Sequence, residues 1–149
     1  RRQRRLARWL ARSLIDLVPH SADAITWVPA TPERRRSRGF DQAEEFARSL
    51  ARLSGVPVVR LLSRGHDDRR QTGLTREQRL RGPTLTACRR TSGFVVVVDD
   101  VITTGSSLVV ATAALRDVGA ERVVGVVAAA TPDATTTAST RLDDRGYYP

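Results

Sequence analysis

The hydrophobic pattern alternates between helical and strand-like segments along the chain. Three segments have apolar residues at helical spacing: residues 6–18, 41–53 and 108–118. Four short runs of apolar or β-branched residues predict strands, namely residues 24–28, 56–62, 94–98 and 122–130, and Pro57 weakens the second of them. Strands that alternate with helices predict an α/β fold with a parallel sheet, and such sheets bind ligands beyond the carboxyl ends of their strands.

Between the second and third predicted strands lies a long polar segment, residues 63–90, with few large apolar side chains. A connection this long inside a compact domain is uncommon and usually functional, so we expect a lid that closes over bound ligand. Thr75 and Gln78 have capping-box spacing, which predicts a short helix at residues 76–81. We expect a domain at residues 24–131, with an amphipathic helix in residues 1–23 before it and a tail at residues 132–149 after it.

The first predicted helix is basic as well as amphipathic, because Arg5, Arg8 and Arg12 lie between its apolar residues. Such a helix could lie on a membrane or on nucleic acid. Packing of its apolar side against the domain is the interpretation that we favour, because most surface helices behave in this way.

The charge of the chain favours anionic partners. Its formal net charge is +9, and all 25 basic residues are Arg, whose guanidinium group suits bidentate contacts with phosphate. The single cysteine, Cys88, excludes an internal disulfide and a Cys-based metal cluster. No apolar run reaches the roughly 18 residues of a membrane span and no signal peptide is recognisable, so we expect a cytoplasmic protein. The chain has no Met and begins at Arg1, so we expect its natural start to be missing.

One segment combines the features of a phosphate site. Residues 95–107 read Val-Val-Val-Val-Asp-Asp-Val-Ile-Thr-Thr-Gly-Ser-Ser, which places two carboxylates after a buried strand, then a loop of small residues, then a helix N-terminus. The glycine lets a ligand approach the backbone, and the unpaired N–H groups at the helix start attract anions. Candidate substrate-binding residues in this segment are Asp99, Asp100, Thr103, Thr104, Gly105, Ser106 and Ser107.

Asp99 and Asp100 are neighbours on a predicted strand, so their side chains need not lie on the same face of the sheet. Adjacent strand residues face opposite ways, so Asp99 and Asp100 need not both reach a ligand unless the backbone turns there. We expect them to divide ribose hydroxyls, bound Mg²⁺ and support of the loop between them. Helix capping by Ser106 or Ser107 alone would not explain two acids followed by Thr-Thr-Gly-Ser-Ser.

Other phosphate-binding motifs do not fit the chain. A P-loop requires a Lys in its glycine-rich turn, and the chain has no Lys; a Gly-x-Gly-x-x-Gly dinucleotide fingerprint is also missing. A strand that ends in Asp-Asp is also typical of response-regulator receivers, but these need a Lys and more chain after Asp100 than is present here.

Residues 95–107 resemble the phosphoribosyl-pyrophosphate motif of type I phosphoribosyltransferases. Two further segments are similar to signatures of the competence-protein ComF family, namely Arg38-Gly-Phe-Asp-Gln42 and Gln71-Thr-Gly-Leu-Thr-Arg-Glu-Gln-Arg79. Together the three motifs span roughly residues 25 to 130. The resemblance implies a phosphoribosyltransferase-type, Rossmann-like fold with a long mobile loop. It also implies binding of phosphoribosyl pyrophosphate or a nucleoside 5-monophosphate, with Mg²⁺ carried by the diphosphate and no metal ligand set of the protein's own.

The chain departs from the family pattern in two ways. Members of the ComF family often carry an N-terminal Cys-rich zinc module, which this chain lacks. Related enzymes use a loop Lys, which cannot exist here, so Arg76 or Arg79 would have to meet the leaving pyrophosphate. The candidate catalytic residues are therefore Asp99, Asp100, Arg76 and Arg79.

An arginine cluster precedes the second predicted helix: Arg34, Arg35, Arg36 and Arg38. Cations at a helix N-terminus oppose the helix dipole, so we expect that the cluster does not serve helix stability. We expect Arg38 to bind pyrophosphate and the other three to be solvated.

Two functions remain open. The paired acids favour an enzyme that transfers phosphoribosyl to a nitrogen nucleophile, in which preorganised charges stabilise the sugar cation and the leaving pyrophosphate. The missing Lys favours a non-catalytic module that keeps the nucleotide pocket and serves DNA uptake or regulation through its basic surface. The expected partners are phosphoribosyl pyrophosphate or a nucleotide; single-stranded DNA, the competence machinery and a second copy of the chain are further candidates.

Overall fold

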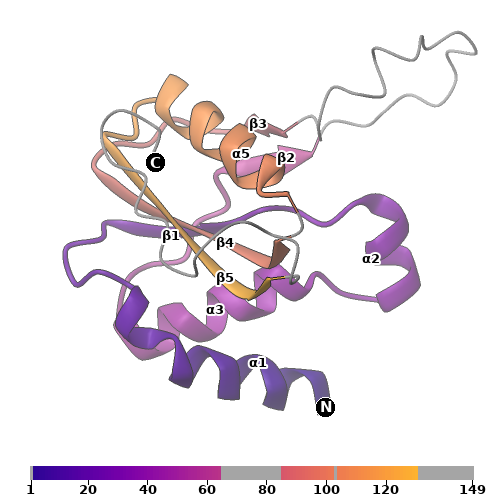
Figure 1. Ribbon diagram of the computed structural model, residues 1–149. Helices are drawn as coiled ribbons and strands as arrows, with labels where there is room; N and C mark the ends of the chain where they lie inside the picture. Colours follow the sequence, from indigo (N-terminus) through magenta and orange to yellow (C-terminus); the bar gives the residue numbers. More distant parts are fainter. Residues whose placement is uncertain (1, 65–84, 103, 131–149) are drawn as a thin grey trace, which may run out of the picture.

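Helices and strands alternate in the computed structural model, which describes residues 2–64, 85–102 and 104–130 (Figure 1). The elements follow in the order α1 (Arg2–Ser13), η1 (Ile15–Leu17), β1 (Ala24–Trp27), α2 (Pro32–Arg38), α3 (Gln42–Ser54), β2 (Leu62–Arg64), β3 (Leu85–Ala87), β4 (Phe94–Ile102), α5 (Ser106–Asp117) and β5 (Arg122–Ala130). The predicted α/β class is therefore confirmed.

A parallel three-stranded sheet forms the centre of the fold. Its middle strand is β4, which pairs in parallel with β1 on one side and with β5 on the other. The four consecutive valines of β4, residues 95–98, are fully buried, as expected for a parallel strand that is covered on both faces. The short strands β2 and β3 form a separate antiparallel pair.

Helices cover both faces of the sheet (Figure 1). Because successive side chains of a strand point to opposite faces, the valines of β4 divide between two cores. Val96 and Val98 pack with Phe46 and Leu50 of α3. Val95 and Val97, on the other face, belong to a cluster that also contains Leu108, Ala111 and Leu115 of α5 and Leu62 and Leu85 of the β2–β3 pair. The sheet is thus fixed between α3 and α5.

The hydrophobic pattern missed α2, which has no buried residue and therefore no apolar periodicity. The sequence signals for α2 are instead the residues at its two ends. Thr31 is the N-cap and accepts a hydrogen bond from the backbone N–H of Arg34 at 3.3 Å, and Gly39 ends the helix at a φ of 75°. Arg35, Arg36 and Arg38 lie in its last turn, where cations favour the helix dipole. These three arginines therefore precede α3, as predicted, but they also end α2 and favour its dipole, which was not predicted from the sequence.

The N-terminal helix is shorter than predicted, because α1 ends at Ser13 and a 3-10 turn, η1, follows. Its apolar side packs only in part against the domain. Ala11 is buried and Leu10 packs against the α3 side of the core, whereas Leu6 and Trp9 are 56% and 64% exposed. Within the described ranges no helix is long and apolar enough to cross a membrane.

The strand predicted at residues 56–62 is reduced to a single bridge between Val58 and Ile25. The carbonyl of Pro57 accepts the Ile25 N–H and the Val59 N–H donates to the Ile25 carbonyl, both at 2.8 Å. Proline has no N–H with which to extend such a ladder, and β2 begins only at Leu62. Within the predicted loop at residues 63–90, residues 63–64 belong to β2 and residues 85–87 form β3. Most of the predicted lid, the helix at residues 76–81 and the tail at 132–149 lie outside the described residues.

Candidate functional site

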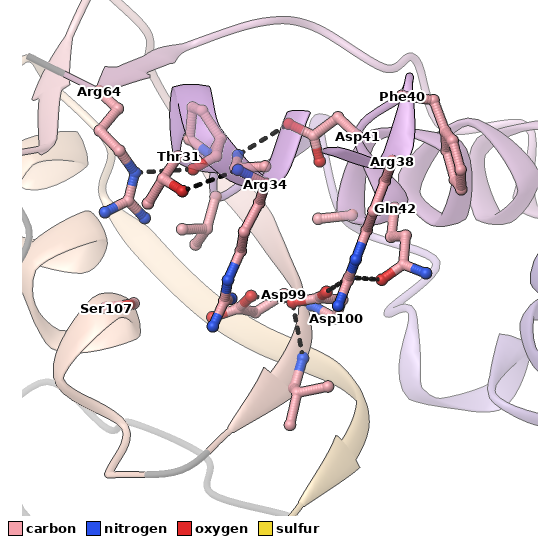
Figure 2. A pocket seen from close by; sticks show the side chains of 15 residues that line it. Thr31, Arg34, Arg38, Phe40, Asp41, Gln42, Arg64, Asp99, Asp100 and Ser107 are labelled. Atoms are coloured by element: carbon pink, nitrogen blue, oxygen red, sulfur yellow. Dashed lines mark hydrogen bonds and ion pairs between the residues drawn. The ribbon is translucent and has the colours of Figure 1, made fainter. Parts of the chain in front are cut away.

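A pocket of about 410 Å³ lies where β1 and β4 end, within the size range of small-molecule sites. Residues 28–31 after β1, residues 99–101 of β4 and Ser107 of α5 line it, together with Arg34 and Arg38 of α2, residues 40–43 and Arg64 of β2 (Figure 2). Its position agrees with the expectation that a parallel sheet binds ligands beyond the carboxyl ends of its strands.

Both predicted carboxylates reach this pocket, although β4 continues past them to Ile102. Asp99 is buried, with 8% of its surface exposed. Its Oδ1 accepts the backbone N–H of Asp100 at 2.8 Å, and the Oδ1 of Asp100 accepts the N–H of Val101 at 2.9 Å. Each carboxylate thus bends toward the following backbone amide, and strand alternation does not separate the two acids.

The carboxyl group of Asp99 changes its protonation near neutral pH. Burial raises the pKa of Asp99 from 3.8 to about 7, the neighbouring Asp100 carboxylate raises it as well, and the backbone N–H of Asp100 and the charge of Arg64 lower it. A cation placed beside Asp99 would favour its charged form. The pocket can therefore respond to a cationic ligand by releasing a proton.

Arginines from two elements face these acids. The Nη1 of Arg38 lies 3.7 Å from the Oδ2 of Asp100 and also donates to the side-chain oxygen of Gln42. Figure 2 shows the Arg34 side chain extending toward the two acids. Arg64 donates its Nε–H to the Pro29 carbonyl at 2.9 Å, and burial lowers its pKa. Arg34 lines the pocket and is exposed, so its expected solvation stays a prediction. The sequence offered no signal for Arg64, because only the fold brings β2 to this pocket.

The predicted phosphate loop lies at the edge of the pocket, to which it contributes Ser107. Gly105 is the N-cap of α5 with a φ of 75°, and no side chain caps this helix. A Cβ added at Gly105 would meet no atom within 4 Å among the described residues. The Thr104 and Ser106 hydroxyls lie 3.0 Å apart beside it. The start of α5 is therefore open to an anion. Three other predicted site residues, Thr103, Arg76 and Arg79, lie outside the described residues.

Comparison with known families identifies the domain. The family model for the phosphoribosyl transferase domain matches residues 36–147. The chain belongs to this family. The match begins within α2 and includes Arg38, the two acids of β4 and the start of α5, so most of the pocket lies inside the matched phosphoribosyl transferase domain. No curated protein matches the chain.

Solved structures support the same phosphoribosyltransferase fold. The chain is 26% identical to glutamine phosphoribosylpyrophosphate (PRPP) amidotransferase from B. subtilis, complexed with ADP and GMP, with a TM-score of 0.59 over 85% of this chain and 26% of that one. It is 24% identical to an allosteric regulatory enzyme of purine biosynthesis, with a TM-score of 0.56 over 85% of this chain and 25% of that one. The chain thus spans about a quarter of each of these proteins.

Proposed function

We propose that the pocket binds phosphoribosyl pyrophosphate or a nucleoside 5-monophosphate, and that the domain transfers phosphoribosyl to a nitrogen acceptor. The observation that carries this proposal is the set of groups that line one pocket. Two acids, Asp99 and Asp100, line it together with three arginines, and Ser107 contributes from the first turn of α5. These groups suit a ligand that carries a phosphate, ribose hydroxyls and a diphosphate.

The start of α5 and the Ser107 hydroxyl would hold the 5-phosphate, because helix N-terminal amides attract anions. The two carboxylates would accept hydrogen bonds from the ribose hydroxyls. The 26% identical amidotransferase is complexed with ADP and GMP. This similarity supports nucleotide binding by the domain, whichever way the nucleotide lies in the pocket.

In the reaction, the bond from ribose C1 to a pyrophosphate oxygen breaks and a bond from the acceptor nitrogen to C1 forms, after which the nitrogen loses a proton. Positive charge develops on the sugar ring and negative charge on the leaving group. Asp100, and Asp99 once a bound cation favours its charged form, are placed to stabilise the sugar cation. Arg34, Arg38 and Arg64 are placed to stabilise the pyrophosphate in a preorganised site.

The residues fit Mg²⁺ that arrives with the substrate. The described part of the chain contains no group of three or more His, Cys, Asp or Glu side chains that could hold a metal ion. Mg²⁺ commonly takes one or two carboxylates together with phosphate oxygens and waters, and Asp99 and Asp100 supply that number. When bound, the ion would neutralise part of the diphosphate charge.

Calorimetric titration of phosphoribosyl pyrophosphate with and without Mg²⁺ tests the binding, and a screen of nitrogen acceptors for pyrophosphate release tests the transfer. The double variant Asp99→Asn with Asp100→Asn should weaken Mg²⁺-dependent binding more than binding of free phosphate. Asp117→Asn, an exposed carboxylate at the far end of α5, is the matched control. Equal losses for both ligands in the double variant would contradict the role of the acids.

A ComF-type module in DNA uptake is the second candidate, and the surface of α1 favours it. Arg8, Arg12 and Trp9 are exposed on this helix, and arginines next to an exposed aromatic ring suit the phosphates and bases of single-stranded DNA. Fluorescence anisotropy with single-stranded DNA at several salt concentrations tests this function. Binding that weakens steeply with salt and is reduced by Trp9→Ala, together with no pyrophosphate release for any acceptor, would favour the module over the enzyme.

A further inference from the structure

Asp41 is a buried carboxylate at the edge of the pocket, with 6% of its surface exposed. Its Oδ1 accepts the backbone N–H of Glu44 at 3.3 Å and thereby caps α3. Its Oδ2 accepts the backbone N–H of Ala30 at 2.8 Å, eleven residues earlier in the chain. One side chain therefore joins the start of α3 to the loop that follows β1.

That loop, residues 29–31, is also hydrogen-bonded to two of the arginines that line the pocket (Figure 2). The Pro29 carbonyl accepts the Nε–H of Arg64 at 2.9 Å, and the Thr31 hydroxyl accepts the N–H of Arg34 at 3.3 Å. Each residue of the loop is thus bonded to a different element: Pro29 to β2, Ala30 to α3 and Thr31 to α2. A displacement of the loop would displace both arginines together.

Capping alone does not require a carboxylate here. Ser, Thr and Asn cap helices as well as Asp does, and a buried carboxylate carries a desolvation cost that a hydroxyl does not. What the carboxylate adds is a second acceptor atom, which lets it bind the Ala30 and Glu44 amides at the same time. Its charge also raises the pKa of Arg64, against the larger effect of burial, so it stabilises the charged guanidinium.

We propose that Asp41 is a positioning residue, which holds the loop at residues 29–31 and thereby sets Arg34 and Arg64 for the diphosphate group of the ligand. This inference rests on the proposed function, because it assumes that Arg34 and Arg64 receive the diphosphate. It assigns to Asp41 an effect on the binding of the diphosphate and none on the binding of the phosphate at the start of α5.

The test compares Asp41→Ser with Asp23→Ser, by calorimetry with Mg²⁺-pyrophosphate and, separately, with ribose 5-phosphate. Serine keeps the cap of α3 but cannot also reach Ala30. Asp23 is the matched control, because its Oδ2 accepts one backbone N–H, that of Phe94, at 2.7 Å at the opposite end of β4. Asp41→Ser should weaken pyrophosphate binding by at least about tenfold, which corresponds to about 1.4 kcal/mol, and leave ribose 5-phosphate binding within about twofold. Asp23→Ser should change neither.

Asp41→Asn separates the cap from the link, because its side chain has an oxygen in place of only one of the two carboxylate oxygens and its NH2 group cannot accept the other N–H. It should show the same selective loss of pyrophosphate affinity, and full affinity in this variant would overturn the inference. Equal losses of both ligands in Asp41→Ser would also overturn it, since they would indicate a general loosening of the fold. If the unaltered protein binds neither pyrophosphate nor phosphoribosyl pyrophosphate, the proposed function fails and this inference with it, whereas unchanged pyrophosphate binding in Asp41→Ser refutes this inference alone.

Discussion

Replacing Asp99 with Asn should make the stability of the protein less dependent on pH. Burial raises the pKa of Asp99 in the folded protein from its ordinary value of 3.8 to about 7. A carboxyl group whose pKa is higher in the folded than in the unfolded state contributes stability that is fully present below the unfolded pKa and lost as the pH rises through the folded pKa. The free energy of unfolding should therefore fall between pH 4 and pH 7, over a window set by these two values.

The size of the effect follows from 1.36 kcal/mol per pKa unit. The whole shift corresponds to about 4 kcal/mol, and more than half of it falls between pH 5 and pH 8, because the unfolded carboxyl is already mostly ionised at pH 5. Asn stays neutral and keeps an oxygen that can accept the Asp100 N–H, as Asp99 does at 2.8 Å. The stabilisation produced by Asp99→Asn should thus grow by roughly 2–3 kcal/mol from pH 5 to pH 8.

Urea denaturation of both proteins at several pH values between 5 and 8 measures this difference, with Asp117→Asn as a control for the loss of one exposed carboxylate. Parallel stability curves for the unaltered protein and Asp99→Asn would refute the reasoning. A stabilisation that shrinks as the pH rises would show that Asp99 is better stabilised as a charged group than its burial indicates.

Three further changes test other parts of the molecule. Gly105→Val should abolish binding of ribose 5-phosphate, because a branched side chain is strained at a φ of 75° and would fill the open space at the start of α5; unchanged affinity in calorimetry would contradict the placement of the phosphate. Arg38→Ala should weaken pyrophosphate binding by about tenfold, as expected for the loss of one charged hydrogen bond, and equal weakening of a neutral nucleoside would argue against a charge effect. Leu50→Ala, in the fully buried centre of α3, should lower the free energy of unfolding by about 2–5 kcal/mol in denaturant titrations, and a loss well below 1 kcal/mol would mean that α3 packs loosely on the sheet.

The central strand and its flanks could be predicted from the sequence because their signals are local. The valine run of β4 is typical of a buried parallel strand, and its burial is observed. The glycine before α5 is typical of an anion-binding turn; the structure has Gly105 as the N-cap of α5, and its binding of an anion stays a prediction. β5 begins and ends at the predicted residues, 122 and 130. The position of Asp99 and Asp100 in the pocket was predicted in the same way, from the end of an apolar run.

The sequence predicts Arg38 as a pyrophosphate-binding residue, but the positions of Arg34 and Arg64 in the pocket could not be predicted, because they depend on contacts between distant segments. α2 has no apolar face, so hydrophobic periodicity gives no sign of it. Arg64 reaches the pocket only because its side chain meets the Pro29 carbonyl, 35 residues away. The bond from Ala30 to Asp41 likewise follows from the backbone path of the loop after β1, which the sequence pattern does not describe.

The parallel pairing of β1 with β4 also has a consequence for folding. Ala24 pairs with Val95 and Trp27 with Val98, so the two segments that line the pocket meet only after the chain between them has been brought together. Contacts of such long sequence separation form slowly. Because both segments line the pocket, we expect a ligand to bind the folded state and not the earlier, partly folded states. Saturating ligand should retard unfolding and leave the rate of folding almost unchanged.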